Sequence, residues 1–363
     1  MTWALELRET QRDSQIVGGP DAASILSERA AGLVAAGRRL FVITDRNVMG
    51  LWGSEVIGAL GDLAGSSAVR VVPPGETSKS VATAEACWQW MASVGARRDG
   101  TVIALGGGVI GDLAGFVAAT YLRGLELWQV PTTLLAQVDS SVGGKVGVNL
   151  PAGKNLVGAF YQADLVVIDP SFLSTLSERE LANGLGEVVK YALLAEDDLL
   201  EVLESGTEAI CGRSEEMLSS VVRRCVELKT EVVVADETEH GPRAVLNLGH
   251  TTAHALENAL GYGEIGHGAA VGLGLLVALA VSERKCGAPQ ALRTRLARLM
   301  ERLGLPSRLP LPATERLIEA ARRDKKISSR GSGFVLLEDR GRPVFDIDVT
   351  PLEFAEALEV IRA

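Results

Sequence analysis

The sequence predicts an α/β fold in which a parallel-sheet domain precedes a mainly α-helical domain. In the first half, short apolar runs alternate with segments of helical periodicity, a pattern typical of a parallel sheet covered on both faces. After Asp169-Pro170 the helical periodicity continues with few strand signals. Because 363 residues are many for one ordinary compact core, we expect two domains, at residues 1–170 and 171–363.

The strands of the predicted sheet are short, continuous and apolar, and helix-like segments such as residues 80–94 separate several of them. In chain order they are residues 39–44, 68–72, 100–105, 125–130 and 165–168. Continuous apolar runs of this length are typical of strands that are buried on both faces.

The second half is predicted to be built from helices. Helical periodicity covers residues 181–203, 217–233, 250–260, 267–286 and 290–303. The sequence shows no internal repeat, and no low-complexity linker separates the two halves. We therefore expect the halves to pack closely and to form a cleft between them.

Composition and charge narrow the class of protein. The chain is 47% hydrophobic and 23% charged, as ordinary globular proteins are. Its net charge of -10 argues against a nucleic-acid partner, because phosphate binding leaves a basic footprint. A small anionic substrate remains possible where a few cations converge.

The sequence shows no pattern typical of secretion or of a membrane span. The N-terminal segment lacks the basic, apolar and small-residue regions of a secretion signal. The most apolar window, residues 269–281, is short and Gly-rich, so we expect no membrane span. The four cysteines show no CxxC pairing and suit buried free thiols in a reducing compartment. These observations predict a cytoplasmic protein.

A glycine turn follows the predicted strand 100–105 and precedes a helix-like stretch. Residues 106–111 satisfy G-x-G-x-x-G in that strand–turn–helix context. Such glycines let the backbone approach a pyrophosphate, and the helix N-terminus offers free N–H groups. The pattern favours a Rossmann-like dinucleotide site over a turn that needs glycine for packing alone. No clear ribose-binding acid follows about twenty residues later, and Asp45, which ends an earlier strand, is the better candidate.

Three of the four histidines fall within eighteen residues of one another. His250 and His254 are four residues apart and share one face of a predicted helix, and His267 follows between glycines. A single histidine on an apolar helix is more often a core residue, but this cluster favours a metal site. Either Glu187 or Glu257 could supply a carboxylate ligand, and spacing does not choose between them.

Cations and amides occur in several Gly-bearing, otherwise apolar segments. For any one lysine a solvated surface position is the commoner explanation, but Lys145, which follows paired glycines and precedes a valine, fits that explanation poorly. Such groups suit a substrate with a phosphate at one end and a carboxylate at the other. The set comprises Arg123, Lys145, Asn149, Lys154, Asn155, Lys190, Lys229, Arg243, Asn247, Lys325 and Lys326.

Taken together, these segments resemble the 3-dehydroquinate synthase family from about Asp45 to about Phe334. The resemblance is carried by an ordered series of motifs: GGGVIGDLAGFVAATYLRG, VPTTLLAQVDSSVGGKVGVN, GKNLVGAFYQ, GLGEVVKYALL, LKTEVV, RAVLNLGHTTAHALE, the HG of GHGAAVG, and DKK. It implies a lyase of the shikimate pathway that uses NAD and zinc or cobalt and acts as a homodimer. Thr252-Ala253 and Ala269 depart from residues common in the family, but neither change affects an implied catalytic group.

The resemblance also implies roles for individual residues. The metal ligands would be Glu187, His250 and His267, so that His254 becomes a substrate-side residue. The residues implied to contact the cofactor are Asp45, Asn47, Glu76, Lys79, Gly106, Gly107, Gly108, Asp112, Thr132, Thr133, Lys145, Lys154, Thr175 and Leu176. Those implied to meet the substrate phosphate are Lys145, Asn155, Asn247, His254 and Lys326, with Arg123 from a second subunit. Lys229 and Arg243 would hold a carboxylate, and Asp139 and Lys190 would contact ring hydroxyls.

The implied substrate is 3-deoxy-D-arabino-heptulosonate 7-phosphate. The implied reaction combines transient oxidation by NAD, phosphate elimination, reduction and intramolecular aldol closure to 3-dehydroquinate. Three alternatives remain open: another sugar phosphate cyclase, a metal-dependent polyol dehydrogenase, and a non-catalytic NAD-binding protein. Retention of His254, Lys229 and Arg243 favours the substrate that bears a carboxylate.

Overall fold

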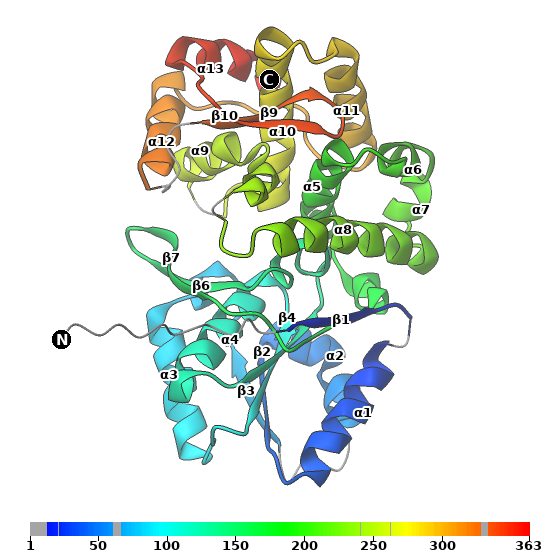
Figure 1. Cartoon of the computed structure of the whole chain (residues 1–363), viewed down its shortest axis with the longest axis vertical. Helices are drawn as coiled ribbons and strands as arrows, with labels where there is room; N and C mark the ends of the chain where they lie inside the picture. Colours follow the sequence, from blue (N-terminus) through cyan, green and yellow to red (C-terminus); the bar gives the residue numbers. More distant parts are fainter. Residues whose placement is uncertain (1–12, 21, 61–66, 240, 262, 328–332) are drawn as a thin grey trace, which may run out of the picture.

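The computed structural model describes residues 13–20, 22–60, 67–239, 241–261, 263–327 and 333–363. A six-stranded sheet and its helices form the lower half of Figure 1, and a largely helical assembly forms the upper half. The α/β sheet followed by helices was predicted from the sequence, and the structure confirms it.

All neighbouring strands of the sheet run parallel, in the order β1-β8-β5-β4-β2-β3. The strands are β1 (Gln15–Gly18), β2 (Leu40–Asp45), β3 (Ser67–Val72), β4 (Thr101–Gly106), β5 (Glu126–Pro131) and β8 (Leu165–Ile168). The five predicted strands are confirmed. The edge strand β1 was missed because it has only four residues, none of them buried, and so gives little hydrophobic signal.

Successive residues of a strand are buried in two separate hydrophobic cores, because side chains alternate between the faces of a sheet. Leu40 and Val42 pack with α1 and α2 on one face, whereas Phe41 and Ile43 pack with α3 and α4 on the other. The helices are α1 (Ala22–Ala35), α2 (Arg46–Ala59), α3 (Val81–Ser93) and α4 (Gly108–Thr120). The core on the α4 side continues without a break into the helical half, so the two halves share one apolar interior.

The helical half contains the predicted helices with two corrections, together with helices at residues 207–211, 314–327 and 351–358 that were not predicted. Its elements are η5 (Pro170–Thr175), α5 (Glu178–Leu194), α6 (Leu199–Ser205), α7 (Thr207–Cys211), α8 (Glu215–Ala235), η6 (Pro242–Asn247), α9 (His250–Leu260), α10 (His267–Lys285), α11 (Gln290–Arg302), α12 (Thr314–Ile327) and α13 (Pro351–Leu358). The single helix predicted over residues 181–203 is wrong: α5 ends at Leu194, and Asp197 accepts a hydrogen bond from the Leu199 N–H where α6 begins. The antiparallel pair β9 (Phe334–Asp339) and β10 (Arg342–Ile347) was also missed.

Helix α10 is the central element of this half and packs against α5, α9, α11 and β9. Within the described residues it is the one helix whose length and composition would suit a membrane span, but 78% of its most apolar window is buried inside the protein. Burial of that kind is typical of a core helix.

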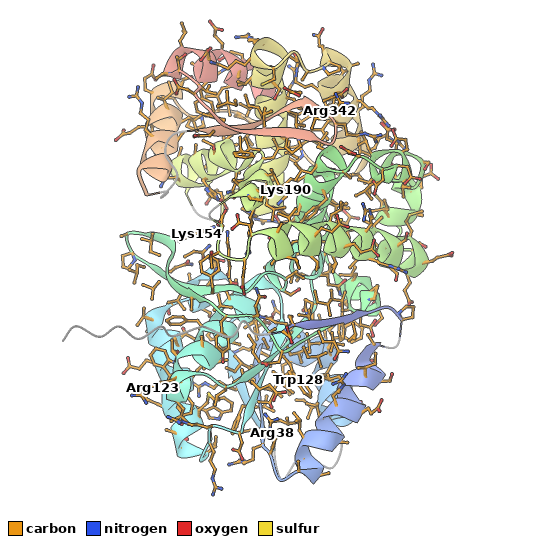
Figure 2. All side chains as sticks on the ribbon, viewed as in Figure 1. Arg38, Arg123, Trp128, Lys154, Lys190 and Arg342 are labelled. Carbon is orange, nitrogen blue, oxygen red and sulfur yellow. The ribbon has the colours of Figure 1, made fainter. Side chains whose placement is uncertain are left out.

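A two-stranded hairpin lies between the halves (Figure 1). Its strands are β6 (Lys145–Leu150) and β7 (Gly153–Phe160), which pair antiparallel. No strand was predicted for this segment, because glycines interrupt its apolar pattern. Lys154, labelled in Figure 2, belongs to this hairpin. The division into domains at residue 170 stays a prediction.

Candidate active site

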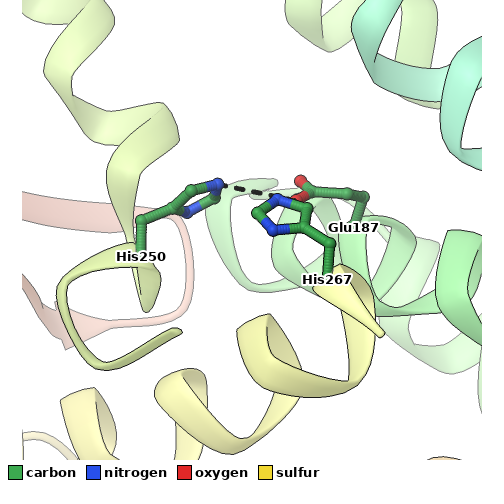
Figure 3. Close-up of side chains that lie close together, drawn as sticks. All are labelled: Glu187, His250 and His267. Atoms are coloured by element: carbon green, nitrogen blue, oxygen red, sulfur yellow. Dashed lines mark ion pairs between the residues drawn. The ribbon is translucent and has the colours of Figure 1, made fainter. Parts of the chain in front are cut away.

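Three side chains from three helices converge in the helical half (Figure 3). Glu187 lies on α5, and His250 and His267 are the first residues of α9 and α10. One ligand atom from each lies within 4.8 Å of the others. The Nε2 atoms of both histidines lie 3.5 Å from Oε1 of Glu187. The structure thus brings together the three predicted metal ligands.

Close helix crossings make this convergence possible. A Cβ atom on Gly186 would lie 2.0 Å from the carbonyl oxygen of Gly268, so α5 and α10 can touch backbone to backbone only with glycine there. Similarly, a Cβ atom on Gly274 would lie 2.1 Å from the carbonyl oxygen of Gly249, the residue before α9. Each glycine is next to or near a predicted ligand, which places the helix ends within reach of one another.

The chemistry of this group fits a divalent cation. Glu187 is fully buried and forms an ion pair with Lys190, but neither of its carboxylate oxygens has a hydrogen-bond donor of suitable geometry among the described residues. Burial raises the pKa of Glu187, but Lys190, His267 and His250 together outweigh that effect and lower the pKa to about 2. Two imidazoles and one carboxylate form a typical catalytic zinc set that leaves a coordination position open.

The two histidines differ in their electrostatic surroundings. Burial lowers the pKa of His250 to about 3, which keeps its imidazole neutral. Burial also lowers the pKa of His267, but the carboxylates of Glu187 and Glu257 raise it to about 10. A proton on His267 therefore supplies the positive charge that these two carboxylates require. A bound cation would supply it instead.

His254 lies beside this group, one helical turn after His250. Its ring centroid is 5.7 Å from that of His250 and 6.3 Å from that of His267. Among the described residues, the three-ligand group contains neither His254 nor Glu257. The geometry agrees with a place for His254 beside the metal ligands, and its substrate role stays a prediction.

A buried charge network lies between the halves of the molecule, next to the ligands. Asp139 belongs to η4 (Ala136–Ser140), which follows the sheet strand β5. Lys229 donates to both the carboxylate and the backbone oxygen of Asp139, each at 2.6 Å. Lys190 lies 4.0 Å from the same carboxylate. Burial raises the pKa of Asp139, but the two lysines lower it well below its usual range, so this residue is ionised.

Tyr191 completes this network and was missed by the sequence analysis. Its hydroxyl donates to Oδ1 of Asp139 at 2.9 Å. Burial and the nearby Asp139 raise the pKa of Tyr191 well above its usual value, so the hydroxyl stays a donor. The only available signal was its place directly after Lys190 in the motif GLGEVVKYALL, which does not reveal a contact with a distant aspartate.

Two predicted phosphate ligands share a carboxylate that the sequence analysis did not single out. Lys145 forms an ion pair with Glu239, and Asn247 donates to the same carboxylate at 2.8 Å. Burial raises the pKa of Glu239, but Lys145 and Asn247 outweigh it, so the net pKa is lowered. Glu239 stands in an acidic run, and acidic runs are usually solvated, so the pattern gave no reason to assign it a role.

The side chain of Arg243 donates hydrogen bonds to backbone carbonyl oxygens. It is 2% exposed, and its two terminal nitrogens donate to the carbonyl oxygens of Glu237 and Gly143. Among the described residues its Nε is buried without an acceptor. Nε is therefore a donor that Arg243 could offer to a substrate carboxylate.

The glycine turn lies at the carboxyl edge of the sheet. Gly106 ends β4, and α4 begins at Gly108 with Gly107 as an N-cap that has no side-chain acceptor. The chain passes from β2 outward to β3 and then returns to β4 on the other side of β2. The carboxyl ends of β2 and β4 therefore form the switch point at which open α/β sheets bind ligands.

Asp45 lies at this switch point, at the end of β2. Its Oδ1 accepts hydrogen bonds from the N–H groups of Asn47 and Val48, which caps α2. Thr132, which follows β5, lies next to the glycine turn, and its N–H donates to the Gly106 carbonyl oxygen at 3.0 Å. The first turn of α4 and Asp45, the N-cap of α2, thus lie at the same switch point. This arrangement fits a bound dinucleotide.

The other predicted cofactor contacts surround the hairpin. Lys79 is 6% exposed and contacts Asp112 and Asn155, and Asn149 donates to Glu76 at 2.7 Å. Burial raises the pKa of Asp112, although Lys79 opposes the shift. Farther along the sheet edge, the Thr175 hydroxyl accepts a hydrogen bond from Trp52, and the Leu176 carbonyl oxygen accepts one from Arg213. Thr133 lies at the turn, against Gly107.

One predicted substrate residue, Arg123, is not brought to this site. Arg123 ends a short segment, η3 (Tyr121–Arg123), that follows α4 in the sheet half, far from Lys190 in Figure 2. The side chain of Lys326, on α12, lies outside the described residues, as does that of Lys325. The individual roles of all these residues stay predictions.

Family models match the chain in both halves. One, described as 3-dehydroquinate synthase N-terminal, matches residues 69–183, and another, described as 3-dehydroquinate synthase C-terminal, matches residues 184–327. A 3-dehydroquinate synthase of Symbiobacterium thermophilum is 45% identical over 328 residues, which cover 90% of this chain and 91% of that relative.

Solved structures of sugar phosphate cyclases share the fold. The 2-epi-5-epi-valiolone synthase of Streptomyces hygroscopicus subsp. jinggangensis 5008, with NAD+ and Zn2+ bound, has a TM-score of 0.87 at 30% identity and covers 99% of both chains. A 2-deoxy-scyllo-inosose synthase complexed with carbaglucose-6-phosphate, NAD+ and Co2+ has a TM-score of 0.83 at 26% identity, over 94% of this chain and 95% of that one. Sequence identity along most of its length, together with both family models, shows that the chain belongs to the 3-dehydroquinate synthase family.

Proposed function

We propose that the chain converts 3-deoxy-D-arabino-heptulosonate 7-phosphate to 3-dehydroquinate and inorganic phosphate. The observation that carries this proposal is the convergence of buried Glu187 with His250 and His267 in a member of this family. The enzyme uses NAD and a divalent metal. When bound, NAD supplies a reversible oxidation and the metal, zinc or cobalt, polarises an alcohol oxygen.

The residues around the metal ligands would orient the substrate ring. Asp139 is ionised and fixed by Lys229 and Tyr191, so its carboxylate can accept a hydrogen bond from a ring hydroxyl. Lys190 lies between Glu187 and Asp139 and would hold a second hydroxyl. Because these groups are already positioned, little reorganisation is needed when the substrate binds.

The substrate carboxylate would bind next to this network. Lys229 and Arg243 are the cations proposed to receive it, and Nε of Arg243 has no acceptor among the described residues. A buried guanidinium nitrogen without a partner is costly, and a carboxylate would satisfy it. This feature favours a substrate that carries a carboxylate over a neutral sugar phosphate.

The substrate phosphate would take the place of an internal carboxylate. Lys145 and Asn247, which we propose as phosphate ligands together with Asn155, His254 and Lys326, both contact Glu239. Two anions cannot share these donors at low cost, so Glu239 would turn away when the phosphate arrives. The phosphate would then accept hydrogen bonds from the same groups and be held in position to leave.

The cofactor would bind at the carboxyl ends of β2 and β4. Gly106, Gly107 and Gly108 let a pyrophosphate approach the N-terminus of α4. Asp45 keeps Oδ2 available for a ribose hydroxyl, because both of its capping hydrogen bonds use Oδ1. The other proposed contacts are Asn47, Glu76, Lys79, Asp112, Thr132, Thr133, Lys145, Lys154, Thr175 and Leu176.

We also propose an oligomeric state and a cellular compartment for this protein. Arg123 lies in the sheet half, far from Lys190 in Figure 2, and we propose that it completes the phosphate site of a second copy in a homodimer. We further propose a cytoplasmic location and two domains divided near residue 170. The free cysteines suit a reducing compartment.

A phosphate-release assay tests the function. With the heptulosonate phosphate, we expect inorganic phosphate and 3-dehydroquinate, identified by mass, only when NAD and the metal are present, and no net NADH. A chelator should stop the release. The second candidate is another sugar phosphate cyclase, favoured by the 99% coverage of the valiolone synthase structure. Turnover of other heptulose phosphates alone would support it, whereas NADH accumulation with glycerol would support a polyol dehydrogenase.

A further inference from the structure

The two histidines of the proposed metal site are held differently at their second ring nitrogens. Nδ1 of His250 lies 3.2 Å from the backbone carbonyl oxygen of Leu248. Nδ1 of His267 lies 3.5 Å from a carboxylate oxygen of Glu257. In both rings Nε2 faces Glu187, so Nδ1 points away from the proposed metal position.

Glu257 is buried on the metal-facing side of α9. Its side chain is 5% exposed, and it follows His250 by seven residues, so two helical turns place both residues on one face. It lies against the outer nitrogen of His267 rather than against Glu187. Glu257 therefore stands behind a ligand, although the sequence left it open as a ligand itself.

A lysine from the other half of the molecule balances this buried charge. Nζ of Lys154, on the hairpin strand β7, lies 3.1 Å from Oε1 of Glu257. This is the same oxygen that contacts His267. The contacts thus form a continuous series from the hairpin through Glu257 to His267 and the proposed metal.

We propose that Glu257 is a positioning residue of the metal centre, which fixes the orientation of His267 and links it to Lys154 of the hairpin. The carboxylate accepts the Nδ1 proton of His267, so that Nε2 carries the lone pair that binds the metal. A carboxylate behind a histidine ligand also raises the basicity of that ligand. The inference rests on the proposed metal site and adds to it a group that does not touch the ion.

Metal affinity measured by chelator competition tests this role on the full-length protein. Glu257→Gln should weaken zinc binding roughly 10- to 100-fold, and Glu257→Leu, which removes the acceptor altogether, should weaken it at least as much. Glu264→Gln is the matched control, because Glu264 is exposed, carries the same charge and lies three residues before His267. Its zinc affinity should stay within about twofold of the wild type.

The cobalt-loaded protein gives a second readout. Its visible absorption reports the geometry of the ligands, so the bands should shift in Glu257→Gln and stay unchanged in Glu264→Gln. Equal zinc affinity and equal spectra in the wild type and Glu257→Gln would overturn the positioning role. If the wild type itself fails to bind one zinc ion, the proposed metal site fails instead, so the two failures are distinguishable.

A double-mutant cycle tests the link to the hairpin. In the presence of Glu257, Lys154→Met should change the free energy of zinc binding. In the Glu257→Gln background the same substitution should change it by less than about half as much. Equal effects in both backgrounds would show that Lys154 acts only as a distant charge and would overturn the link. The circular dichroism of each metal-free variant should match that of the wild type.

Discussion

The glycine turn of the sheet half and the metal-ligand group of the helical half are built in opposite ways. The turn consists of adjacent residues, 106–108, and it offers backbone N–H groups at the start of one helix. The metal-ligand group draws Glu187, His250 and His267 from three helices and offers buried side chains. A site made of backbone is fixed by local sequence, whereas a site made of side chains depends on helix packing. Changes in one should therefore leave the other intact.

The largest expected effect is from Glu187→Gln. Loss of the carboxylate should remove the bound metal and reduce kcat/KM on the order of 10³-fold, because the metal's charge stabilisation is worth several kcal/mol. NAD affinity, measured by fluorescence titration, should stay within about twofold, since the glycine turn is in the other half. Metal content by elemental analysis checks the first part.

Glu180→Gln serves as the control for Glu187→Gln. It lies on the same helix, α5, is exposed, and loses the same charge. It should retain both the metal and the activity. Loss of NAD binding in Glu187→Gln would break the comparison, because it would show that the two sites depend on each other.

Asp139→Asn tests the charge network that joins the two halves. Without that carboxylate, buried Lys229 and Lys190 lose a counter-charge, and the free energy of unfolding should fall by about 3 kcal/mol. Tyr191→Phe keeps every charge and removes one hydrogen bond to Asp139, so it should cost only about 1–2 kcal/mol. Urea denaturation measures both. Equal losses in the two variants would contradict the view that charge pairing is the main interaction here.

Gly107→Ala tests the sheet half alone. A Cβ atom there would lie 3.0 Å from Cγ2 of Thr133 and would fill space at the turn. We expect the NAD dissociation constant to rise roughly tenfold, which corresponds to about 1.4 kcal/mol, with unchanged metal content. Gly32→Ala is the control, since a Cβ atom on Gly32 meets nothing within 4 Å. Metal loss in Gly107→Ala would argue against independent sites.

The smallest effect concerns Glu239 and pH. Burial raises the pKa of Glu239, but Lys145 and Asn247 outweigh it and lower the pKa from its ordinary value of 4.5. A lowered pKa in the folded state means that this ionised carboxylate stabilises the fold above about pH 4.5 and that the contribution is lost as the pH falls. Lys145 is half exposed, so Glu239→Gln should cost no more than about 1 kcal/mol at pH 7.

Denaturation at several pH values checks this prediction. The difference in unfolding free energy between the wild type and Glu239→Gln should shrink as the pH falls below 4.5. A difference that grows at low pH would mean that the carboxyl group is stabilised in its protonated form.

Much of the fold could be predicted from hydrophobic pattern. The strands 100–105 and 165–168 were recognisable because a strand buried on both faces is apolar throughout. The hairpin was not recognisable, because its glycines and exposed residues disrupt any period. The break between α5 and α6 was missed because apolar residues recur on both sides of Glu196, so the periodicity alone did not mark it.

The sequence by itself determined the order of five sheet strands, the glycine turn and the cluster of histidines, since each is a pattern of nearby residues. Only the tertiary structure decided the position of each acid: Glu187 faces Nε2 of both histidines, and Glu257 lies behind His267. Spacing along one helix cannot reveal a contact with another helix. That contact depends on how closely two backbones approach, and here Gly186 and Gly268 permit it.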